Sequence, residues 1–501
     1  MEQSEATGAG AGESGLSRGL RQKLGLLIGP AALLSTLFLP APAGLSAAGW
    51  HTAGVGALLA VFWICESIPI PATALLPLVL FPALQLGDIR ETATPYAHPI
   101  VFLFLGGFII ALAMQRCNLH RRIAINLMGA MGTQPKRIIA GFLLASALLS
   151  MWVSNTATAM MMLPIALSVT QLIPAGSKGA HGFTTALVLS VAYGATTGGM
   201  GTLIGTPPNA LLAAYLGKVY ETDIGFGQWM LLGVPVVMVT LPIVYLILTR
   251  VSFKLPAGEL PGFRDLLERE KTGMGRFSRE EKIVSAVFSL TALGWITQPW
   301  LVRVVPLITD TSIGLIGALL LFFIPVRARR GEFVMDWATA NRLPWEVLLL
   351  FGGGLSLAGN IERHGLSRFL GDMCNGLQGA PMLLTLGFIC FGILLLTELT
   401  SNTATAATFL PIAGAIALSF GQNPLLFLIP VALAANCSYM MPVGTPPNAI
   451  VFGSGMVTLP QMVKAGIWMN VLLVPIIIGL VMLLGPWAFG IQMDLIPAWA
   501  K

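Results

Sequence analysis

The chain has 501 residues, of which 55% are hydrophobic and only 10% are charged, with a formal net charge of +6. An ordinary soluble domain carries about 25% charged residues, so this composition excludes a water-soluble globular protein. Apolar stretches of about 18 residues or more recur along nearly the whole chain, and that length spans a membrane. The composition therefore predicts an all-α polytopic membrane protein, surrounded by lipid in the cell membrane. We expect no nucleic-acid partner, because no basic stripe with interleaved aromatic residues is present.

Residues 1–20 are expected to form a disordered cytoplasmic tail, because the first 17 are small, acidic and rich in Gly and Ser. Two apolar stretches, 138–173 and 381–421, are broken at their centres by polar residues, which predicts re-entrant hairpins. The predicted spans are 24–40, 47–64, 68–86, 98–115, 182–217, 229–249, 283–300, 310–326, 345–362, 424–457 and 464–490. The sequence thus predicts about eleven transmembrane helices and two re-entrant hairpins.

Basic residues cluster at positions 18–23, 116–137, 250–282 and 327–342. Cytoplasmic loops of membrane proteins carry an excess of Lys and Arg, so these clusters predict a cytoplasmic N-terminus and an external C-terminus. A few external residues break this rule, and they are Arg303, Arg363 and Arg368.

The chain contains an internal repeat. When Gly106 is aligned with Gly353 without any gap, the segment Ser154-Asn155-Thr156-Ala157-Thr158-Ala159 falls on the identical segment Ser401-Asn402-Thr403-Ala404-Thr405-Ala406. After a short gap, Gly205-Thr206-Pro207-Pro208-Asn209-Ala210 matches Gly444-Thr445-Pro446-Pro447-Asn448-Ala449. An odd number of spans in each copy would invert the second copy, as in many secondary transporters. We therefore expect a first inverted repeat with an extra first helix at 21–250, a cytoplasmic basic loop at 251–282, and a second inverted repeat at 283–501.

The polar tips of the hairpins are candidate ion sites. Unpaired polar groups in hydrocarbon are costly, so a polar tip is tolerated where it lines a cavity or binds something. The helix before a tip ends in free carbonyl groups that suit a hard cation, and the Pro-Pro breaks free the carbonyls of Gly205 and Gly444. Ser150 and Thr397 lie four residues before the tip serines and share their helix face. We predict two sodium sites: Ser150, Ser154, Asn155 and Gly205 form one, and Thr397, Ser401, Asn402 and Gly444 form the other.

The helix after each tip presents free N–H groups, which suit an anion. We predict an anion site made of Asn155, Thr156, Asn402 and Thr403, with Thr206-Pro207 and Thr445-Pro446 from the two breaks. No Arg or Lys lies near either motif in the sequence, so bound sodium ions would balance the charge of the anion. Glu398 is a buried candidate without a counterpart in the first copy, and we expect a structural or tuning role for it.

At these paired motifs the chain resembles the divalent anion/sodium symporter family of di- and tricarboxylate and sulfate transporters. The resemblance covers nearly the whole chain after the tail. It implies a homodimer with a scaffold domain and a transport domain that moves like an elevator. It also implies that the tip asparagines and threonines contact substrate carboxylates and that the tip serines and the opposing loops hold sodium.

The leading functional hypothesis is a secondary transporter that couples sodium to the import of C4-dicarboxylates such as succinate, malate and fumarate. A sodium-independent dicarboxylate or tricarboxylate exchanger and a sulfate carrier stay open, because hydroxyl and amide sites suit all of these anions. An anion channel would be expected to show charged rings or a continuous polar pore. We expect no enzymatic activity and no organic cofactor, because the sequence shows no nucleophile–base or metal constellation.

Overall fold

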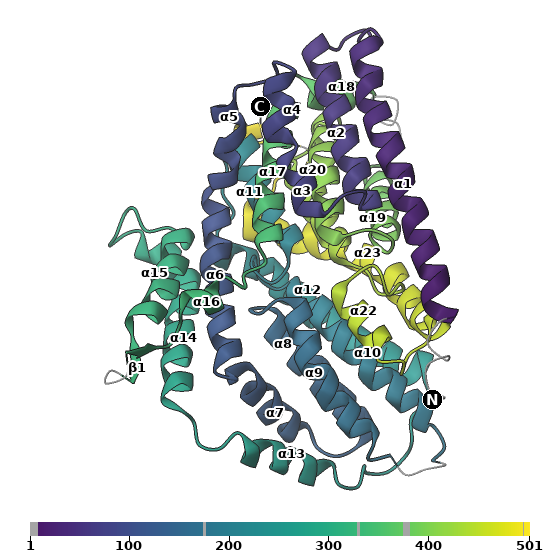
Figure 1. Ribbon diagram of the computed structural model, residues 1–501, viewed down its shortest axis with the longest axis vertical. Coiled ribbons are helices and arrows are strands. Elements are labelled where there is room, and N and C mark those ends of the chain that lie inside the picture. Colours follow the sequence, from purple (N-terminus) through teal and green to yellow (C-terminus); the bar gives the residue numbers. More distant parts are fainter. Residues whose placement is uncertain (1–8, 174–176, 328–330, 374–380, 494, 501) are drawn as a thin grey trace, which may run out of the picture.

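The computed structural model describes residues 9–173, 177–327, 331–373, 381–493 and 495–500 (Figure 1). Helices form most of this part of the chain, and one loop holds a short antiparallel pair of strands, β1 (Pro325–Arg327) and β2 (Glu332–Phe333). A helix satisfies its backbone hydrogen bonds internally, which suits a chain as apolar as this one.

The helices of the first half, in chain order, are α1 (Ala9–Phe38), α2 (Ala47–Cys65), α3 (Ile70–Leu75), α4 (Pro77–Ala83), α5 (Ile89–Ala93), η1 (Thr94–Ala97), α6 (Pro99–Arg116), α7 (Leu119–Met131), α8 (Pro135–Ser150), α9 (Asn155–Thr170), α10 (Ala180–Gly199), α11 (Pro207–Val219), α12 (Phe226–Leu246), η2 (Ile247–Ser252) and α13 (Phe263–Gly273). Those of the second half are α14 (Arg279–Leu301), α15 (Asp310–Phe323), α16 (Trp337–Ala340), α17 (Trp345–Arg363), α18 (Leu366–Met373), α19 (Met382–Thr397), α20 (Asn402–Ser419), α21 (Leu425–Asn436), α22 (Pro446–Gly453), α23 (Leu459–Phe489) and η5 (Ala498–Ala500). Within the described residues, five helical segments are long and apolar enough to cross a membrane: Ala47–Cys65, Ile89–Arg116, Phe226–Ser252, Asn402–Ser419 and Leu459–Phe489.

The helix bounds follow the internal repeat. Helix α8 ends at Ser150 and α19 ends at Thr397, which are the positions that the gap-free alignment equates. The next helices, α9 and α20, begin at the equivalent residues Asn155 and Asn402. Each copy therefore contains a pair of helices joined by a short polar turn, followed by a helix that breaks before Pro-Pro.

Two predicted segments differ from the structure. Helix α1 already begins at Ala9, so the expectation of a disordered tail over 1–20 is wrong for residues 9–20, while residues 1–8 lie outside the described chain. The single span expected at 68–86 is two short helices, α3 and α4, because Pro77 lacks the N–H that a continuous helix would need.

The basic segments meet at one end of the molecule, the lower end in Figure 1, where α7 and α13 lie. Arg122 of α7 pairs with Glu281 at 2.6 Å, and Arg121 pairs with Glu270 of α13. Arg116 pairs with Asp336 at 2.6 Å. These ion pairs join three of the predicted basic segments, so the grouping of 116–137, 250–282 and 327–342 on one side of the protein is consistent with the structure.

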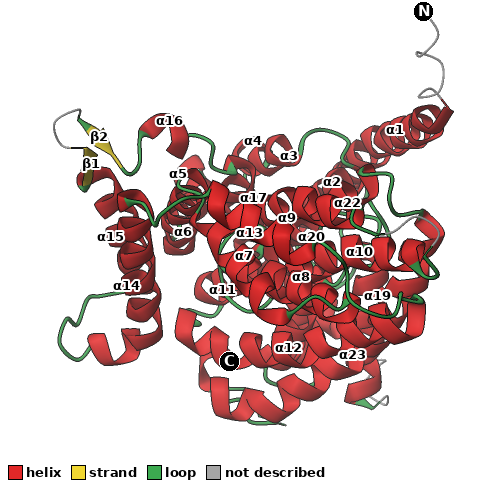
Figure 2. Cartoon of the chain, turned by 90° about the horizontal axis from the view of Figure 1, so that it is seen from below, coloured by secondary structure: helices red, strands yellow, loops and turns green. Residues whose placement is uncertain are grey.

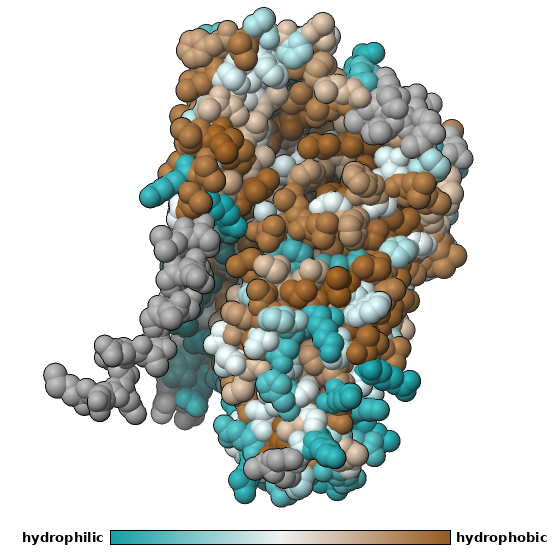
Figure 3. Space-filling model, turned by 90° about the vertical axis from the view of Figure 1, so that its right-hand side faces the viewer, coloured by the Kyte–Doolittle hydropathy of each residue, from teal (hydrophilic) through white to brown (hydrophobic). Residues whose placement is uncertain are grey.

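The outer surface is strongly apolar. In Figure 3 hydrophobic side chains cover most of the upper and middle part of the visible face, and hydrophilic side chains gather at the lower end. Large exposed apolar side chains include Leu27 of α1, Phe388 of α19 and Leu483 of α23, each at least 70% exposed. Figure 2 shows α14 and α15 along one edge, with the two strands beside them. An apolar surface of this extent needs a non-aqueous environment.

Two largely buried helices, α10 and α21, form the core. Every residue of α10 from Thr185 to Gly199 is buried, and so is every residue of α21. Helix α10 packs against α8, α9, α12 and α22, while α21 packs against α11, α19, α20 and α23. A helix that is apolar on all sides belongs in the interior. Each of these two helices ends beside one of the polar tips, so the core fixes the position of both candidate sites.

Candidate functional site

The first site lies between the turn from α8 to α9 and the break that follows α10. Ser150 donates a hydrogen bond to the side-chain oxygen of Asn155. The same inward-facing end of the Asn155 amide lies 3.3 Å from the carbonyl oxygen of Gly205 and 3.2 Å from that of Ala195. Three of the four residues predicted for this sodium site, Ser150, Asn155 and Gly205, are therefore in contact.

The second site repeats this arrangement with equivalent residues. The inward-facing end of the Asn402 amide lies 2.7 Å from the hydroxyl of Thr397, 3.1 Å from the carbonyl oxygen of Gly444 and 3.3 Å from that of Ala435. Thr397 also donates to the Ala435 carbonyl at 2.7 Å. Ala435 lies in the last turn of α21, where backbone carbonyls lack helical partners. The structure thus brings Thr397, Asn402 and Gly444 together as predicted.

Both sites are clusters of acceptor oxygens. With the amide nitrogen facing inward, each asparagine donates to the two carbonyls and no cation is needed; with the amide oxygen facing inward, a cation or a water would have to bridge these oxygens. Two oxygens that each lie about 2.4 Å from a hard cation, with an angle of about 90° between them at the cation, are about 3.4 Å apart. The observed separations of 3.1–3.3 Å are close to this value. Each site therefore offers oxygens of the type that a sodium ion binds, and sodium binding there stays a prediction.

The tip serines and the residues predicted for the anion site make fewer contacts with the two clusters. The Ser154 hydroxyl accepts a hydrogen bond from the Ala157 amide at 3.3 Å, which makes Ser154 the N-cap of α9. Ser401 is the N-cap of α20 but makes no side-chain capping bond. The first turns of both helices, with Thr156 and Thr403, are partly exposed although they lie inside the helical bundle. Free backbone N–H groups at two helix N-termini therefore face accessible space, which suits an anion.

The threonines of the Pro-Pro breaks are buried and already have protein partners. Thr206 donates to the side-chain oxygen of Asn436 at 2.7 Å, and Thr445 accepts a hydrogen bond from the Asn448 amide at 3.2 Å. Pro207 and Pro446 occupy the first positions of α11 and α22, where a missing N–H does no harm. These four residues frame the site, and their contact with an anion stays a prediction.

Sequence reasoning missed Asn436, which connects the two sites. This fully buried side chain accepts the hydrogen bond from Thr206 and donates to the Thr196 carbonyl at 3.1 Å. The Asn402 amide also donates to it, at 3.4 Å to the backbone and 3.5 Å to the side chain. The sequence feature that could have identified it is the position of Asn436 itself, a single amide side chain at the end of the apolar run from Leu425 to Ala435.

The asparagines of the Gly-Thr-Pro-Pro-Asn segments were also missed. Asn209 donates to the carbonyls of Gly199 (3.2 Å) and Thr202 (2.8 Å), and Asn448 donates to the equivalent carbonyls of Ser438 (3.2 Å) and Met441 (3.1 Å). Each asparagine holds the loop that carries the site carbonyl. Their presence in both copies was the signal that could have identified them.

Glu398 has a structural role in the second copy. The carboxylate is only 3% exposed and accepts hydrogen bonds from three successive backbone amides, residues 439–441, at 2.9–3.0 Å. The Ser438 hydroxyl (2.8 Å) and the Asn470 amide (2.7 Å) complete its surroundings. All of these partners are donors, so the two carboxylate oxygens act only as acceptors here. Glu398 thereby fixes the loop that leads to Gly444.

Residues 21–491 match the family model described as the sodium:sulfate symporter transmembrane region. The chain belongs to this family. Family membership confirms the resemblance seen in the sequence motifs and makes the chain a multi-pass membrane transporter. A sodium-dependent dicarboxylate transporter of Staphylococcus saprophyticus is 41% identical over 484 residues, which cover 94% of this chain and 93% of the relative. The transporter of the same description from Staphylococcus aureus is 40% identical, with the same coverage of both chains.

A solved structure shares the fold of this family member. The YdaH transporter of Alcanivorax borkumensis superposes with a TM-score of 0.50 over 80% of this chain and 87% of its own, at 13% sequence identity. At this identity the likeness concerns the fold alone. It agrees with a helical transporter architecture.

Proposed function

We propose that the protein imports C4-dicarboxylates, such as succinate, malate and fumarate, in symport with sodium. The observation that carries this proposal is the pair of equivalent oxygen clusters at Asn155 and Asn402, in a chain 41% identical to a sodium-dependent dicarboxylate transporter. The clusters provide amide, hydroxyl and carbonyl oxygens, which are ligands for a hard cation. The substrate binds between them, at the N-termini of α9 and α20.

Charge balance gives the physical basis of coupling. Arg21 donates to the Leu399 carbonyl in the turn before α20 at 2.9 Å and also pairs with Glu66, but no Arg or Lys side chain bonds to Asn155 or Asn402 among the described hydrogen bonds, so a dianion there meets mainly amide, hydroxyl and helix dipoles. Sodium ions beside the substrate lower the electrostatic cost of its entry, and the substrate lowers theirs. Sodium, bound among Ser150, Asn155 and Gly205 and among Thr397, Asn402 and Gly444, supplies the positive charge. Asn155, Thr156, Asn402 and Thr403 then orient the carboxylates, with Thr206, Pro207, Thr445 and Pro446 behind them.

The two sites are expected to move together. Asn436 joins the tip of the second copy to the break of the first, and Tyr193 of α10 donates to the Tyr439 carbonyl at 2.7 Å. Neither site can shift without breaking buried hydrogen bonds to the other. This supports an elevator-type movement of one body that contains α8–α11 and α19–α22.

The proposal includes eleven spans, two re-entrant hairpins, repeats at 21–250 and 283–501, a cytoplasmic N-terminus, an external C-terminus and a homodimer.

Uptake of radiolabelled succinate into proteoliposomes tests this function. An inward sodium gradient should drive accumulation above equilibrium, and replacement of sodium by choline should abolish it. Sodium-independent uptake that requires internal dicarboxylate would establish an exchanger instead. Competition by sulfate or citrate at concentrations similar to succinate would favour the alternative substrates, and uptake that never exceeds equilibrium despite the gradient would favour a channel.

A further inference from the structure

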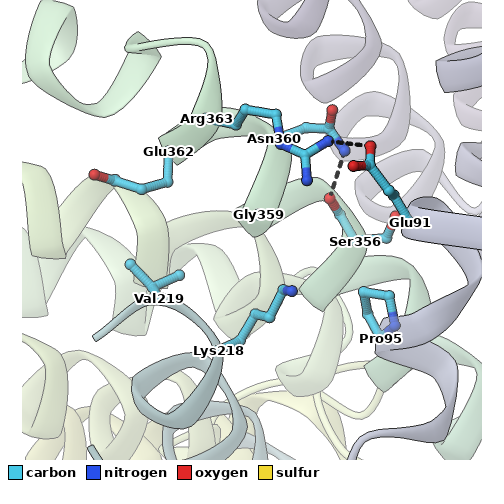
Figure 4. Close-up of a pocket in the computed structure, with 9 residues that line it drawn as sticks. All are labelled: Glu91, Pro95, Lys218, Val219, Ser356, Gly359, Asn360, Glu362 and Arg363. Carbon is cyan, nitrogen blue, oxygen red and sulfur yellow. Dashed lines mark hydrogen bonds and ion pairs between the residues drawn. The ribbon is translucent and has the colours of Figure 1, made fainter. Parts of the chain in front are cut away.

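A cavity of about 220 Å³ (Figure 4) lies beside α5, in the upper part of the molecule in Figure 1 and away from α7 and α13 at its lower end. It forms where the last turns of α11 and α17 meet α5 and η1, on the predicted external side. This volume accommodates a small organic acid. The cavity shares no residue with either cation cluster.

The rim of the cavity carries two basic and two acidic side chains, Lys218, Arg363, Glu91 and Glu362. Arg363 pairs with Glu91 at 2.6 Å, and Glu362 accepts a hydrogen bond from Ser367 at 2.6 Å. Lys218 extends over α17, where a Cβ built on Gly359 would lie 3.3 Å from the lysine Cε. Within the described chain its ammonium group has no ion pair. Figure 4 shows Lys218 and the Arg363 guanidinium on opposite sides of the space above Gly359.

The floor of the cavity contains buried polar atoms without partners. Ser356 is 2% exposed and Asn360 is 6% exposed, and the Ser356 hydroxyl and the Asn360 side-chain oxygen have no hydrogen-bond partner in the described structure. The Asn360 amide nitrogen is directed to the Ser356 carbonyl at 3.1 Å. Buried polar groups are normally satisfied, so such a floor indicates a ligand or ordered water. The free hydroxyl supplies a donor for a carboxylate, and the amide oxygen is left for a water or a ligand hydroxyl.

Helix α11 links this cavity to the tips. It begins at Pro207, beside the first cation cluster, and ends at Val219, which lines the cavity. Its 13 residues span about 20 Å. A second, much smaller space of about 10 Å³ lies between α11, α17 and α20, lined by Leu211, Ala358 and Ala407 among others. An anion held at Lys218 is therefore one helix length from the tips, with an apolar constriction between.

We propose that this cavity is a second anion site, in which Lys218 and the Ser356 hydroxyl hold one carboxylate of a small dicarboxylate before it reaches the tips. The proposal rests on the proposed function for its ligand class, but the site itself needs no sodium. Lys218 supplies a positive charge at the cavity, whereas no Arg or Lys side chain bonds to Asn155 or Asn402 at the tips among the described hydrogen bonds. A cation at the mouth of a cleft raises the local concentration of a dianion and its rate of entry.

The alternative is that Lys218 only compensates the negative C-terminal end of α11, as cations at helix ends commonly do. That role affects the stability of the fold and does not require a ligand. Sodium-free binding separates the two, because the cation clusters are not occupied by sodium under that condition.

Equilibrium dialysis of radiolabelled succinate against the purified full-length protein, in choline buffer of low ionic strength, is the first experiment. We expect weak binding of one succinate per chain by the wild type and by Asn155→Ala. Lys218→Met should reduce it about five- to tenfold, because the variant lacks the ammonium group that makes a charge-assisted hydrogen bond to the carboxylate. Lys464→Met, at the exposed start of α23, is the matched control and should bind like the wild type. Absence of sodium-free binding in the wild type, or equal binding by Lys218→Met, would overturn the proposal.

The outcome is distinguishable from failure of the proposed function. If sodium-dependent binding is absent while sodium-free binding depends on Lys218, the cavity site stands and the symport proposal falls. If sodium-dependent binding persists in Lys218→Met while sodium-free binding is unaffected, the symport proposal stands and the cavity site falls.

Chemical rescue tests the charge of Lys218 directly, because a purely structural role of this residue would not make binding depend on a restored charge. Lys218→Cys treated with 2-aminoethyl methanethiosulfonate regains an ammonium group, whereas methyl methanethiosulfonate adds a neutral group. We expect the first reagent, but not the second, to restore sodium-free binding. The wild type treated in parallel controls for the partly exposed Cys65 and Cys117. Equal results with both reagents would mean that the charge of Lys218 is not used for binding.

Discussion

The hydroxyl of Thr206, in the first half of the chain, donates a 2.7 Å hydrogen bond to the side-chain oxygen of Asn436, in the second half. Both residues are buried, and the same asparagine lies within hydrogen-bond distance of Asn402. The two cation clusters are therefore parts of one polar network. This connection determines how each cluster should respond to substitution in the other.

Asn436→Ala is expected to destabilise the protein and to weaken sodium dependence. The substitution leaves the Thr206 hydroxyl and the Thr196 carbonyl without partners, and each buried unpaired group costs about 1–3 kcal/mol. Thermal unfolding in detergent and the sodium concentration for half-maximal uptake measure the two effects. Asn423→Ala, which removes a cap at the other end of α21, is the control. It should lower stability but leave the sodium requirement unchanged; an equal shift in both variants would contradict a specific role for Asn436.

The hydroxyls one turn before the tips are expected to contribute to cation affinity. Ser150→Ala and Thr397→Val should each raise the sodium concentration for half-maximal uptake about three- to thirtyfold, equivalent to about 0.7–2 kcal/mol per lost oxygen ligand. Ser146→Ala, one turn earlier on α8, removes a buried hydroxyl without a described partner and is the matched control. Unchanged sodium dependence in both test variants would remove these hydroxyls from the proposed sites.

Glu398→Gln is expected to loosen the second site selectively. The amide places an N–H₂ group against backbone N–H donors at residues 439–441, so at least one charged hydrogen bond is lost, at about 1.5–3 kcal/mol. We predict a lower unfolding temperature and a reduced Hill coefficient for sodium in uptake assays. Glu346→Gln, on the exposed first turn of α17, should be neutral. Wild-type stability in Glu398→Gln would show that the loop does not depend on the carboxylate.

Gly198→Ala is expected to disrupt the packing of α8 on α10. A Cβ at this position would lie 2.1 Å from the backbone oxygen of Ala147, so α8 must move and carry Ser150 with it. We predict strongly reduced uptake at any sodium concentration and a destabilisation of about 1–3 kcal/mol, typical of overpacking. Gly392→Ala, on an exposed face of α19 with nothing within 4 Å, should be neutral or slightly stabilising. Normal uptake by Gly198→Ala would mean that the interface has more freedom than the structure shows.

The sequence was sufficient to predict which side chains meet at the two tips, because they occur twice. Ser150 with Asn155, and Thr397 with Asn402, lie at equivalent positions of an internal repeat, and the structure brings each pair together. The helix breaks at the Pro-Pro segments were predictable from the missing N–H groups. A duplicated pattern reports function better than any single motif.

The remaining features depend on backbone atoms and packing, which leave little trace in the sequence. The carbonyls of Ala195 and Ala435 face the clusters, yet alanine has no side chain to suggest a ligand. The donors around Glu398 are mostly backbone amides. The break between α3 and α4 was missed because the surrounding residues are apolar enough for one continuous span.

The buried helix α21 has a consequence for biogenesis. Its 12 residues extend only about 18 Å, whereas the hydrocarbon core of a bilayer is about 30 Å thick. Helix α21 therefore cannot insert as an independent membrane segment and must enter between α20 and α23 after synthesis has passed them. Asn436 is the last residue of α21. The hydrogen bond from Thr206 to Asn436, which connects the first cluster to the second, can therefore form only at this late stage. Substitutions that slow the entry of α21 should lower the amount of the protein in the cell through degradation, before any transport defect is measurable.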